Sequence, residues 1–179
     1  AQHASEGGLL TDTYMPRNIL TAAPWWVTRG RTLAGTEVES AAGRVQANVQ
    51  TLEQGDVVSA GDCQMEILWP PTAHDLGQRN VIVLCRYKER RILIADPGMA
   101  DVLATLAVQC DAIVFTGAER GGGDAALRRV AEHFGARQLI WCGRGSWASR
   151  SEGPGNWNTR DEAIIVEVSE QGEMDVFYQ

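Results

Sequence analysis

The sequence of 179 residues has little of what marks several classes of protein. Lysine occurs once, at Lys88, histidine occurs three times, and no two of the four cysteines have the CxxC spacing of a structural zinc site. The longest apolar runs, such as 81–85, are far shorter than the roughly 20 residues that cross a bilayer. No basic segment followed by an apolar stretch opens the chain, as a signal peptide requires. We therefore expect no membrane insertion by this segment, no metal and no cofactor.

The overall composition is that of a globular domain. Hydrophobic residues make up 44% and charged residues 22% of the chain, close to the average for soluble domains. The length predicts one domain over 1–179. Because the formal net charge is −7, nucleic acid would be bound only through a local basic patch.

Apolar periodicity predicts strands interspersed with two helices. Alternating or continuous apolar runs indicate strands at 17–21, 25–27, 45–51, 57–59, 63–69, 80–87, 90–96, 111–116, 138–142, 163–168 and 174–177. Residues 45–69 are expected to form three short antiparallel strands, while most of 9–44 is poorly periodic. Helical spacing appears at 99–108 and 124–134, the second ending at Gly135. Together these elements predict an α/β fold, a layered mixed β-sheet with helices.

Two further features bear on function. The run 143–159 is rich in glycine and proline and contains Trp147 and Trp157, so it is expected to be a long functional or covering loop. Cys85 and Cys142 lie in apolar strands, which predicts buried or half-buried thiols, with one disulfide or a redox role as the alternative.

Several phrases, in this order along the chain, carry a resemblance to a known family. They are 6–9 (EGGL), 52–56 (LEQGD), 65–70 (MEILWP), 78–84 (QRNVIVL), 90–96 (RRILIAD), 111–115 (DAIVF) and 136–143 (ARQLIWCG). Their order resembles metallo-β-lactamase-like domains, mainly the second half of the αββα sandwich, and most closely the domain appended to ComEC-type DNA-uptake, or competence, membrane proteins. The resemblance implies an extracytoplasmic domain of a bacterial inner or plasma membrane protein.

The metal ligands of that family are replaced in this sequence. Aligned on the Gly-Gly of its metal motif, the three ligand positions hold other residues, and His3 falls in the spacer. Asp96 stands at the family's Gly-Asp position and Glu119 in its HHGS segment. These three residues mark a vestigial site. Since two-metal hydrolysis needs several nitrogen and oxygen donors, the resemblance implies a pseudoenzyme with no catalytic residue.

The resemblance also implies that the chain is truncated at its N-terminus. The strands that precede the family's metal motif would lie upstream of Ala1. We therefore expect apolar surface near the N-terminal strands, covered by the missing upstream part of the same protein or by a homo-oligomer mate.

Three functions remain open. The first is a catalytically silent structural or DNA-guiding domain, in which Arg120, Arg144, Arg150 and Trp147 contact DNA from loops after the strands. The second is an active metal-dependent hydrolase or nuclease with a rearranged site, where Asp96 and Glu119 hold one Mg²⁺ or Mn²⁺. The third is an interaction module that docks a partner unrelated to DNA.

Overall fold

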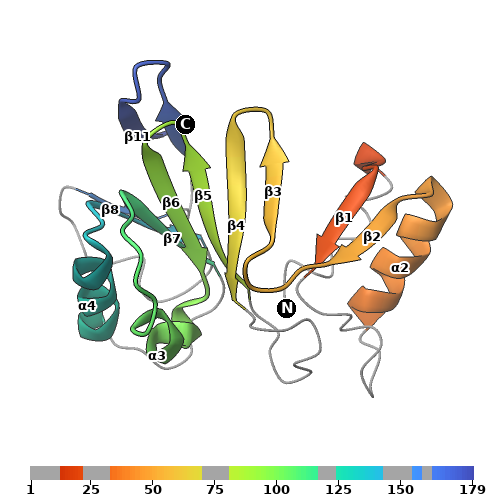
Figure 1. The fold of residues 1–179 in the computed structure, drawn as a ribbon, viewed down its shortest axis with the longest axis horizontal. Helices are drawn as coiled ribbons and strands as arrows, with labels where there is room; N and C mark the ends of the chain where they lie inside the picture. Colours follow the sequence, from red (N-terminus) through yellow and green to blue (C-terminus); the bar gives the residue numbers. More distant parts are fainter. Residues whose placement is uncertain (1–12, 22–32, 70–80, 117–123, 143–154, 159–162) are drawn as a thin grey trace. The chain divides into compact units, whose positions relative to one another are not determined.

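The computed structural model describes most of the chain in two compact units. The residues described are 13–21, 33–69, 81–116, 124–142, 155–158 and 163–179 (Figure 1). One unit comprises 1–56 with 69–81, and the other comprises 57–68 with 82–179.

The first unit contains a parallel strand pair joined across a helix. Strand β1 (Asn18–Thr21) pairs with β2 (Asn48–Thr51), and helix α2 (Leu33–Val45) lies between them in the sequence. A parallel pair needs such a crossover, usually a helix. The short strand expected at 17–21 is thereby confirmed.

Two expectations for this region are wrong. Val45 ends a helix rather than beginning a strand, and β2 pairs with β1 rather than in a meander with 57–69. Among the described side chains of α2, the buried ones are Val38, Ala41 and Ala42, two of them small residues that give a weak apolar signal. Gln46 then takes a left-handed backbone (φ 57°), which ends the helix.

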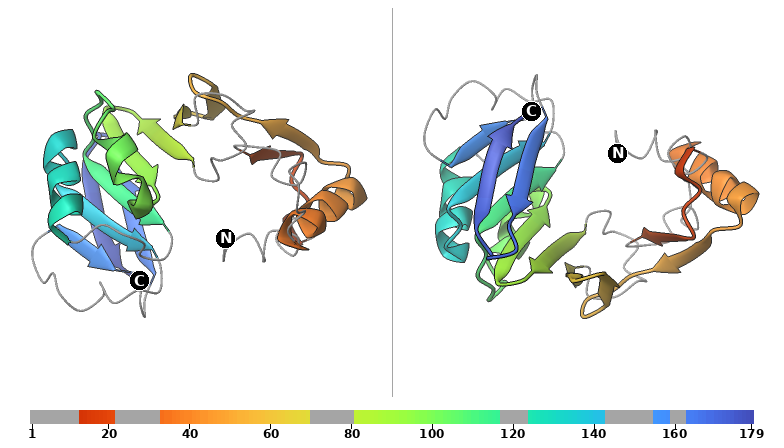
Figure 2. Two further views of the ribbon diagram at one scale, coloured as in Figure 1. Left: turned by 90° about the horizontal axis from the view of Figure 1, so that it is seen from below. Right: turned by 90° about the horizontal axis from the view of Figure 1, so that it is seen from above.

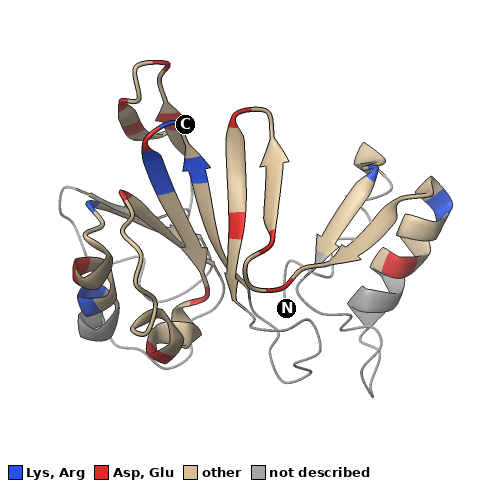
Figure 3. Ribbon diagram, in the orientation of Figure 1, with Lys and Arg blue, Asp and Glu red and all other residues tan. Residues whose placement is uncertain are grey.

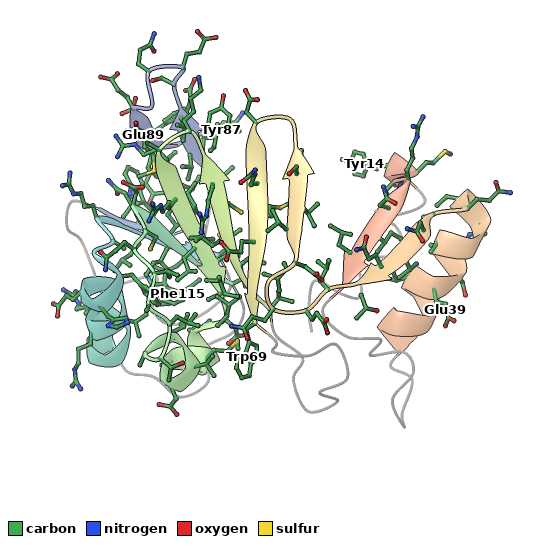
Figure 4. The ribbon with its side chains drawn as sticks, viewed as in Figure 1. Tyr14, Glu39, Trp69, Tyr87, Glu89 and Phe115 are labelled. Carbon is green, nitrogen blue, oxygen red and sulfur yellow. The ribbon has the colours of Figure 1, made fainter. Side chains whose placement is uncertain are left out.

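Apolar side chains near β1 are exposed. Tyr14, labelled in Figure 4, is 76% exposed, Met15 is 69% exposed, and Leu20 is also exposed. Exposed apolar surface was predicted near the N-terminal strands. Its cause, a missing upstream part, stays a prediction, as does the single domain over 1–179.

The second unit is built on a seven-stranded mixed sheet with the order β3-β4-β5-β6-β7-β8-β9. Its strands are β3 (Val57–Ala60), β4 (Cys63–Trp69), β5 (Ile82–Tyr87), β6 (Arg90–Ala95), β7 (Ala112–Thr116), β8 (Gln138–Cys142) and β9 (Asn156–Asn158). β3–β4 and β5–β6 are antiparallel, whereas β6 to β9 run parallel. The predicted layered α/β fold with a mixed sheet is confirmed.

One face of this sheet is buried beneath two helices. Helices α3 (Ala100–Leu103) and α4 (Asp124–Phe134) lie along the same side of the sheet (Figure 2). The cross-strand registers place the buried strand side chains on one face of the sheet, and buried side chains of the two helices complete this core. The buried residues are Ile82, Leu84, Leu93, Ala95, Ile113 and Phe115 from the strands, and Leu103, Val130, Ala131 and Phe134 from the helices.

The hairpin of β10 (Ile164–Val168) and β11 (Met174–Tyr178) lies on the opposite face of the sheet. The Trp157 ring lies 5.2 Å from the Tyr178 ring. At the other end of the hairpin, Arg90 Nε donates to Gly172 O, and Lys88 Nζ donates to Glu170 O. Most strand side chains on this face, such as Val83 and Ile94, are half-buried rather than buried.

Asp111, just before β7, connects three neighbouring strands. Its Oδ1 accepts from Arg90 Nη1 and its Oδ2 from Arg91 N, each at 2.9 Å, while its own N donates to Arg91 O at 2.8 Å. Its carbonyl oxygen accepts from the N–H groups of Arg137 and Gln138. One residue thus fixes β7 between β6 and β8.

Two further elements differ from the sequence prediction. The helix expected at 99–108 begins as the 3₁₀ turn η2 (Pro97–Met99) and ends as α3 at Leu103. Within the loop expected at 143–159, residues Asn156–Asn158 form strand β9, which pairs with β8. The predicted strand at 25–27 lies outside the described residues.

The four cysteines match the main expectation. Cys110 is buried, the other three are half-buried, and none forms a disulfide. Among the residues described, no helix is long and apolar enough to cross a membrane.

Replacing Asp111 with Asn tests the connection between the strands. Asp111→Asn removes the charge that faces Arg90, and its single amide oxygen can accept from Arg90 or from Arg91 N–H but not from both. We expect a loss of about 2 kcal/mol in the free energy of unfolding, measured by urea denaturation. Asp62→Asn, in the exposed β3–β4 turn, is the control and should change it by less than about 0.5 kcal/mol. Equal effects would contradict this role.

The buried thiol of Cys110 predicts a pH dependence. Burial, and secondarily the charge of Asp111, raises the pKa of Cys110 from 9.0 to about 12. The folded state therefore retains a proton that the unfolded chain releases above pH 9. The free energy of unfolding should fall above that pH by up to about 1.4 kcal/mol per unit. Urea denaturation of wild type and Cys110→Ala between pH 8 and 10.5 should show the smaller slope in the variant. Identical slopes would contradict the assignment.

Candidate functional site

The carboxyl ends of β6, β7 and β8 define the candidate site. These strands run parallel, so their ends meet at one edge of the sheet. Ala95 pairs with Phe115, and Thr116 pairs with Cys142. Asp96, directly after β6, therefore lies beside Thr116 of β7, and Cys142 of β8 lies one strand further along the same edge. Open α/β sheets commonly bind ligands at this edge.

The Asp96 carboxylate caps the turn that follows it. Its Oδ1 accepts a hydrogen bond of 2.7 Å from Gly98 N, and its carbonyl oxygen accepts from Met99 N at 3.0 Å. Pro97 occupies the first position of η2, where no N–H is needed. Pro97 and Met99 are both buried, so the cap holds the turn against the core. One carboxylate oxygen of Asp96 therefore already accepts a hydrogen bond that stabilises η2.

Aromatic rings lie beneath this edge, on the helix-covered face. Phe115, labelled in Figure 4, stacks on Trp141 with ring centroids 4.8 Å apart. Trp157 of β9 belongs to the opposite face, and its Nε1 donates to Gln138 Oε1 at 2.7 Å. The strands thus end in a carboxylate, a hydroxyl and a thiol, and the stacked rings lie on the other face of the sheet from Thr116 and Cys142.

Described basic side chains gather elsewhere in this unit. Figure 3 shows them on β5 and β6, where Arg86, Arg90 and Arg91 lie towards the turn that joins the two strands. Arg86 pairs with Glu66, and Arg90 pairs with Asp111. Much of this positive charge is already balanced by carboxylates, and it lies at the opposite end of β6 from Asp96.

Among the predicted site residues, only Asp96 is described. The other vestigial positions, His3 and Glu119, lie outside the described residues. So do all four residues predicted to contact DNA, Arg120, Arg144, Arg150 and Trp147. Their roles stay predictions. In the sequence these four residues follow β7 and β8, whose described carboxyl ends lie at the same edge as Asp96.

The described residues contain no cluster of histidine, cysteine and carboxylate side chains of the kind that holds zinc or a pair of metal ions. No group of three or more histidine, cysteine, aspartate or glutamate side chains in the described part of the chain could hold a metal ion. His133, on α4, has Nε2 2.9 Å from Leu106 O and its ring edge-on to Phe134. It is therefore a packing residue at the edge of the core.

Comparisons with known proteins give structural likeness alone. No protein-family model matches the chain, and no curated protein matches its sequence. Its fold is similar to a diphosphatase of the PhnP family, with 10% identity over 91% of this chain and 59% of that protein, at a TM-score of 0.42.

Two other solved structures are similar at the same level. The metallo-β-lactamase fold protein YhfI from Bacillus subtilis shares 12% identity over 64% of this chain and 54% of its own, at a TM-score of 0.40. CmlA, a diiron β-hydroxylase from Streptomyces venezuelae, shares 15% identity over 70% of this chain and 36% of its own, also at a TM-score of 0.40. The chain spans about a third of CmlA and little more than half of the other two. Likeness this low assigns neither family nor activity.

The cap formed by Asp96 can be separated from metal binding. Asp96→Ala should lower the free energy of unfolding by about 1 kcal/mol, because Gly98 N–H loses its acceptor. Thermal unfolding of both proteins with and without Zn²⁺ or Mn²⁺ measures this, with Asp62→Ala as the exposed control. A structural cap predicts the same difference with and without metal. A metal-dependent rise in wild-type Tm that is absent from Asp96→Ala would contradict it.

Proposed function

We propose that this chain is a catalytically silent metallo-β-lactamase-like domain of a ComEC-type DNA-uptake channel protein, with a structural or DNA-guiding role. The observation that carries the proposal is the state of Asp96. It stands where the resemblance puts a metal-bridging carboxylate, yet it caps η2 through Gly98 and has no partner ligands among the described residues.

The order of elements supports the family part of the proposal. The hairpin β5–β6 and strands β7 and β8 carry phrases of the resemblance, in the order in which the family has them. Asp96 falls at the carboxyl end of β6, the edge at which this architecture carries ligands.

The shortage of metal-ligating side chains supports the absence of catalysis in this proposal. An activated bridging hydroxide needs several nitrogen and oxygen donors around an open metal position. The sequence has only three histidines, and His133 packs against Leu106 and Phe134. Asp96 alone cannot supply such a donor set.

The loops after β7 and β8 would supply the DNA-guiding surface. Arg120, Arg144 and Arg150 supply positive charge, and Trp147 supplies a ring on which a base can stack. Arg86 of β5 and Arg90 of β6 are already paired with carboxylates, which makes them less available for phosphate contacts. Such a domain would face the outside of the cell membrane, beside the upstream part of its own protein or an oligomer mate.

An active hydrolase is the second candidate. Asp96 follows β6 and Glu119 comes in the sequence shortly after β7, and these two strands end side by side at one edge of the sheet. One Mg²⁺ or Mn²⁺ is the cation that oxygen ligands of this kind would hold.

Metal analysis and DNA binding distinguish these functions. After loading with Mn²⁺ and dialysis, the silent domain should retain no stoichiometric metal, whereas the hydrolase should retain one ion that Asp96→Ala releases. DNA binding should weaken steeply with salt. The double variant Arg144→Ala/Arg150→Ala should lower the salt slope by about 2.

The control for DNA binding is Arg128→Ala/Arg129→Ala, which removes two exposed arginines from α4. Absence of salt-sensitive binding would reject DNA guiding and favour a module that docks another partner. An equal loss of slope in both double variants would reject the loops as the contact surface.

A further inference from the structure

Three sulfur-containing side chains share one face of two neighbouring strands. Glu66 of β4 and Arg86 of β5 form an ion pair, which places these two positions on the same side of the sheet. Because side chains alternate along a strand, the odd-numbered positions of both strands point to the other side. Cys63, Met65 and Cys85 therefore lie together on that face, with β4 next to β5 in the sheet.

The two thiols are close enough to interact. Burial raises the pKa of Cys85, and the neighbouring Cys63 raises it further. Both residues and Met65 are half-buried, so the group is neither sealed in the core nor fully in water. Neither cysteine forms a disulfide. All three residues lie on strands of the main sheet, which hold their positions more rigidly than loops would.

The donor set is chemically soft. Thiolate and thioether sulfur select ions such as Cu(I), whereas Mg²⁺, Ca²⁺ and Mn²⁺ prefer oxygen. A structural zinc site takes four ligands from cysteine, histidine or carboxylate, and no such group of even three exists in the described part of the chain. Two cysteine sulfurs and one methionine sulfur therefore suit a soft monovalent ion with two or three ligands better than they suit zinc or an oxygen-preferring ion.

We propose that Cys63, Met65 and Cys85 form a binding site for a soft monovalent metal ion of the Cu(I) type. Binding forms two metal–thiolate bonds and a thioether contact and releases two thiol protons, with no change of oxidation state. The metal's positive charge offsets that of one thiolate, which reduces the cost of ionising a half-buried thiol. Affinity should therefore rise with pH. This inference is independent of the proposed function.

The test uses the reduced full chain under anaerobic conditions. Cu(I) is supplied as its bathocuproine disulfonate complex, and transfer to the protein is followed by loss of the complex's colour. We expect one Cu(I) per chain. Cys63→Ser and Cys85→Ser should each lower the affinity by at least about 100-fold, since even indirect ligand contacts are worth 10–100-fold. Met65→Leu should lower it by about tenfold.

Cys142→Ser and Cys110→Ser are the matched controls and should leave the affinity unchanged. Cys142 is half-buried like the proposed ligands but lies on β8, and Cys110 is buried. If a serine variant fails to fold, alkylation of the wild type gives a second measurement. Bound Cu(I) should protect Cys63 and Cys85, mapped by mass spectrometry, while the reactivity of Cys142 stays the same.

Three results would overturn the proposal. They are no transfer of Cu(I) from the competitor, transfer that depends on Cys142, and transfer that survives loss of both Cys63 and Cys85. Mn²⁺ retained through Asp96 would overturn the silent domain without affecting this site. Conversely, failure to bind Cu(I) would leave the test at Asp96 unchanged.

Discussion

The second unit depends on hydrogen bonds that converge on one carboxylate and one peptide group at Asp111. Parallel strands have no tight turn to fix their register, so a polar contact at their amino ends carries that role. Asp111 binds Arg90 and the Arg91 backbone on one side and the start of β8 on the other. Arg90 also reaches Gly172, so the same contact orients the hairpin β10–β11.

The aligned strands fix the position of the candidate site. With β6, β7 and β8 in register, Asp96, Thr116 and Cys142 lie along one edge of the sheet, next to the stacked rings of Phe115 and Trp141 on the helix-covered face. The Asp96 carboxylate stabilises η2 there and so holds the start of α3.

Strong local patterns predicted much of this unit, and weak ones failed for physical reasons. β4, β8 and α4 agree with the sequence because their apolar residues repeat with the period of the element. Helix α2 was not predicted, since two of the three buried side chains described on it are alanines, which give a weak apolar signal. Strand β9 consists of Asn-Trp-Asn and exists through its pairing with β8, which no local pattern encodes. At the site, sequence placed Asp96 after its strand but gave no sign of its bond to Gly98.

The two faces of the sheet differ in how much buried apolar surface would be exposed if the element that covers each face detached. Beneath α3 and α4 lies a dry core that includes Leu93, Ile113 and Phe134, so removing a helix exposes the centre of the fold. The hairpin β10–β11 covers strand side chains most of which are only half-buried. It is held to the sheet by contacts such as those of Arg90, Lys88 and Trp157. It is therefore the natural unit of partial opening, and its amide protons should exchange with solvent long before those of β6 and β7.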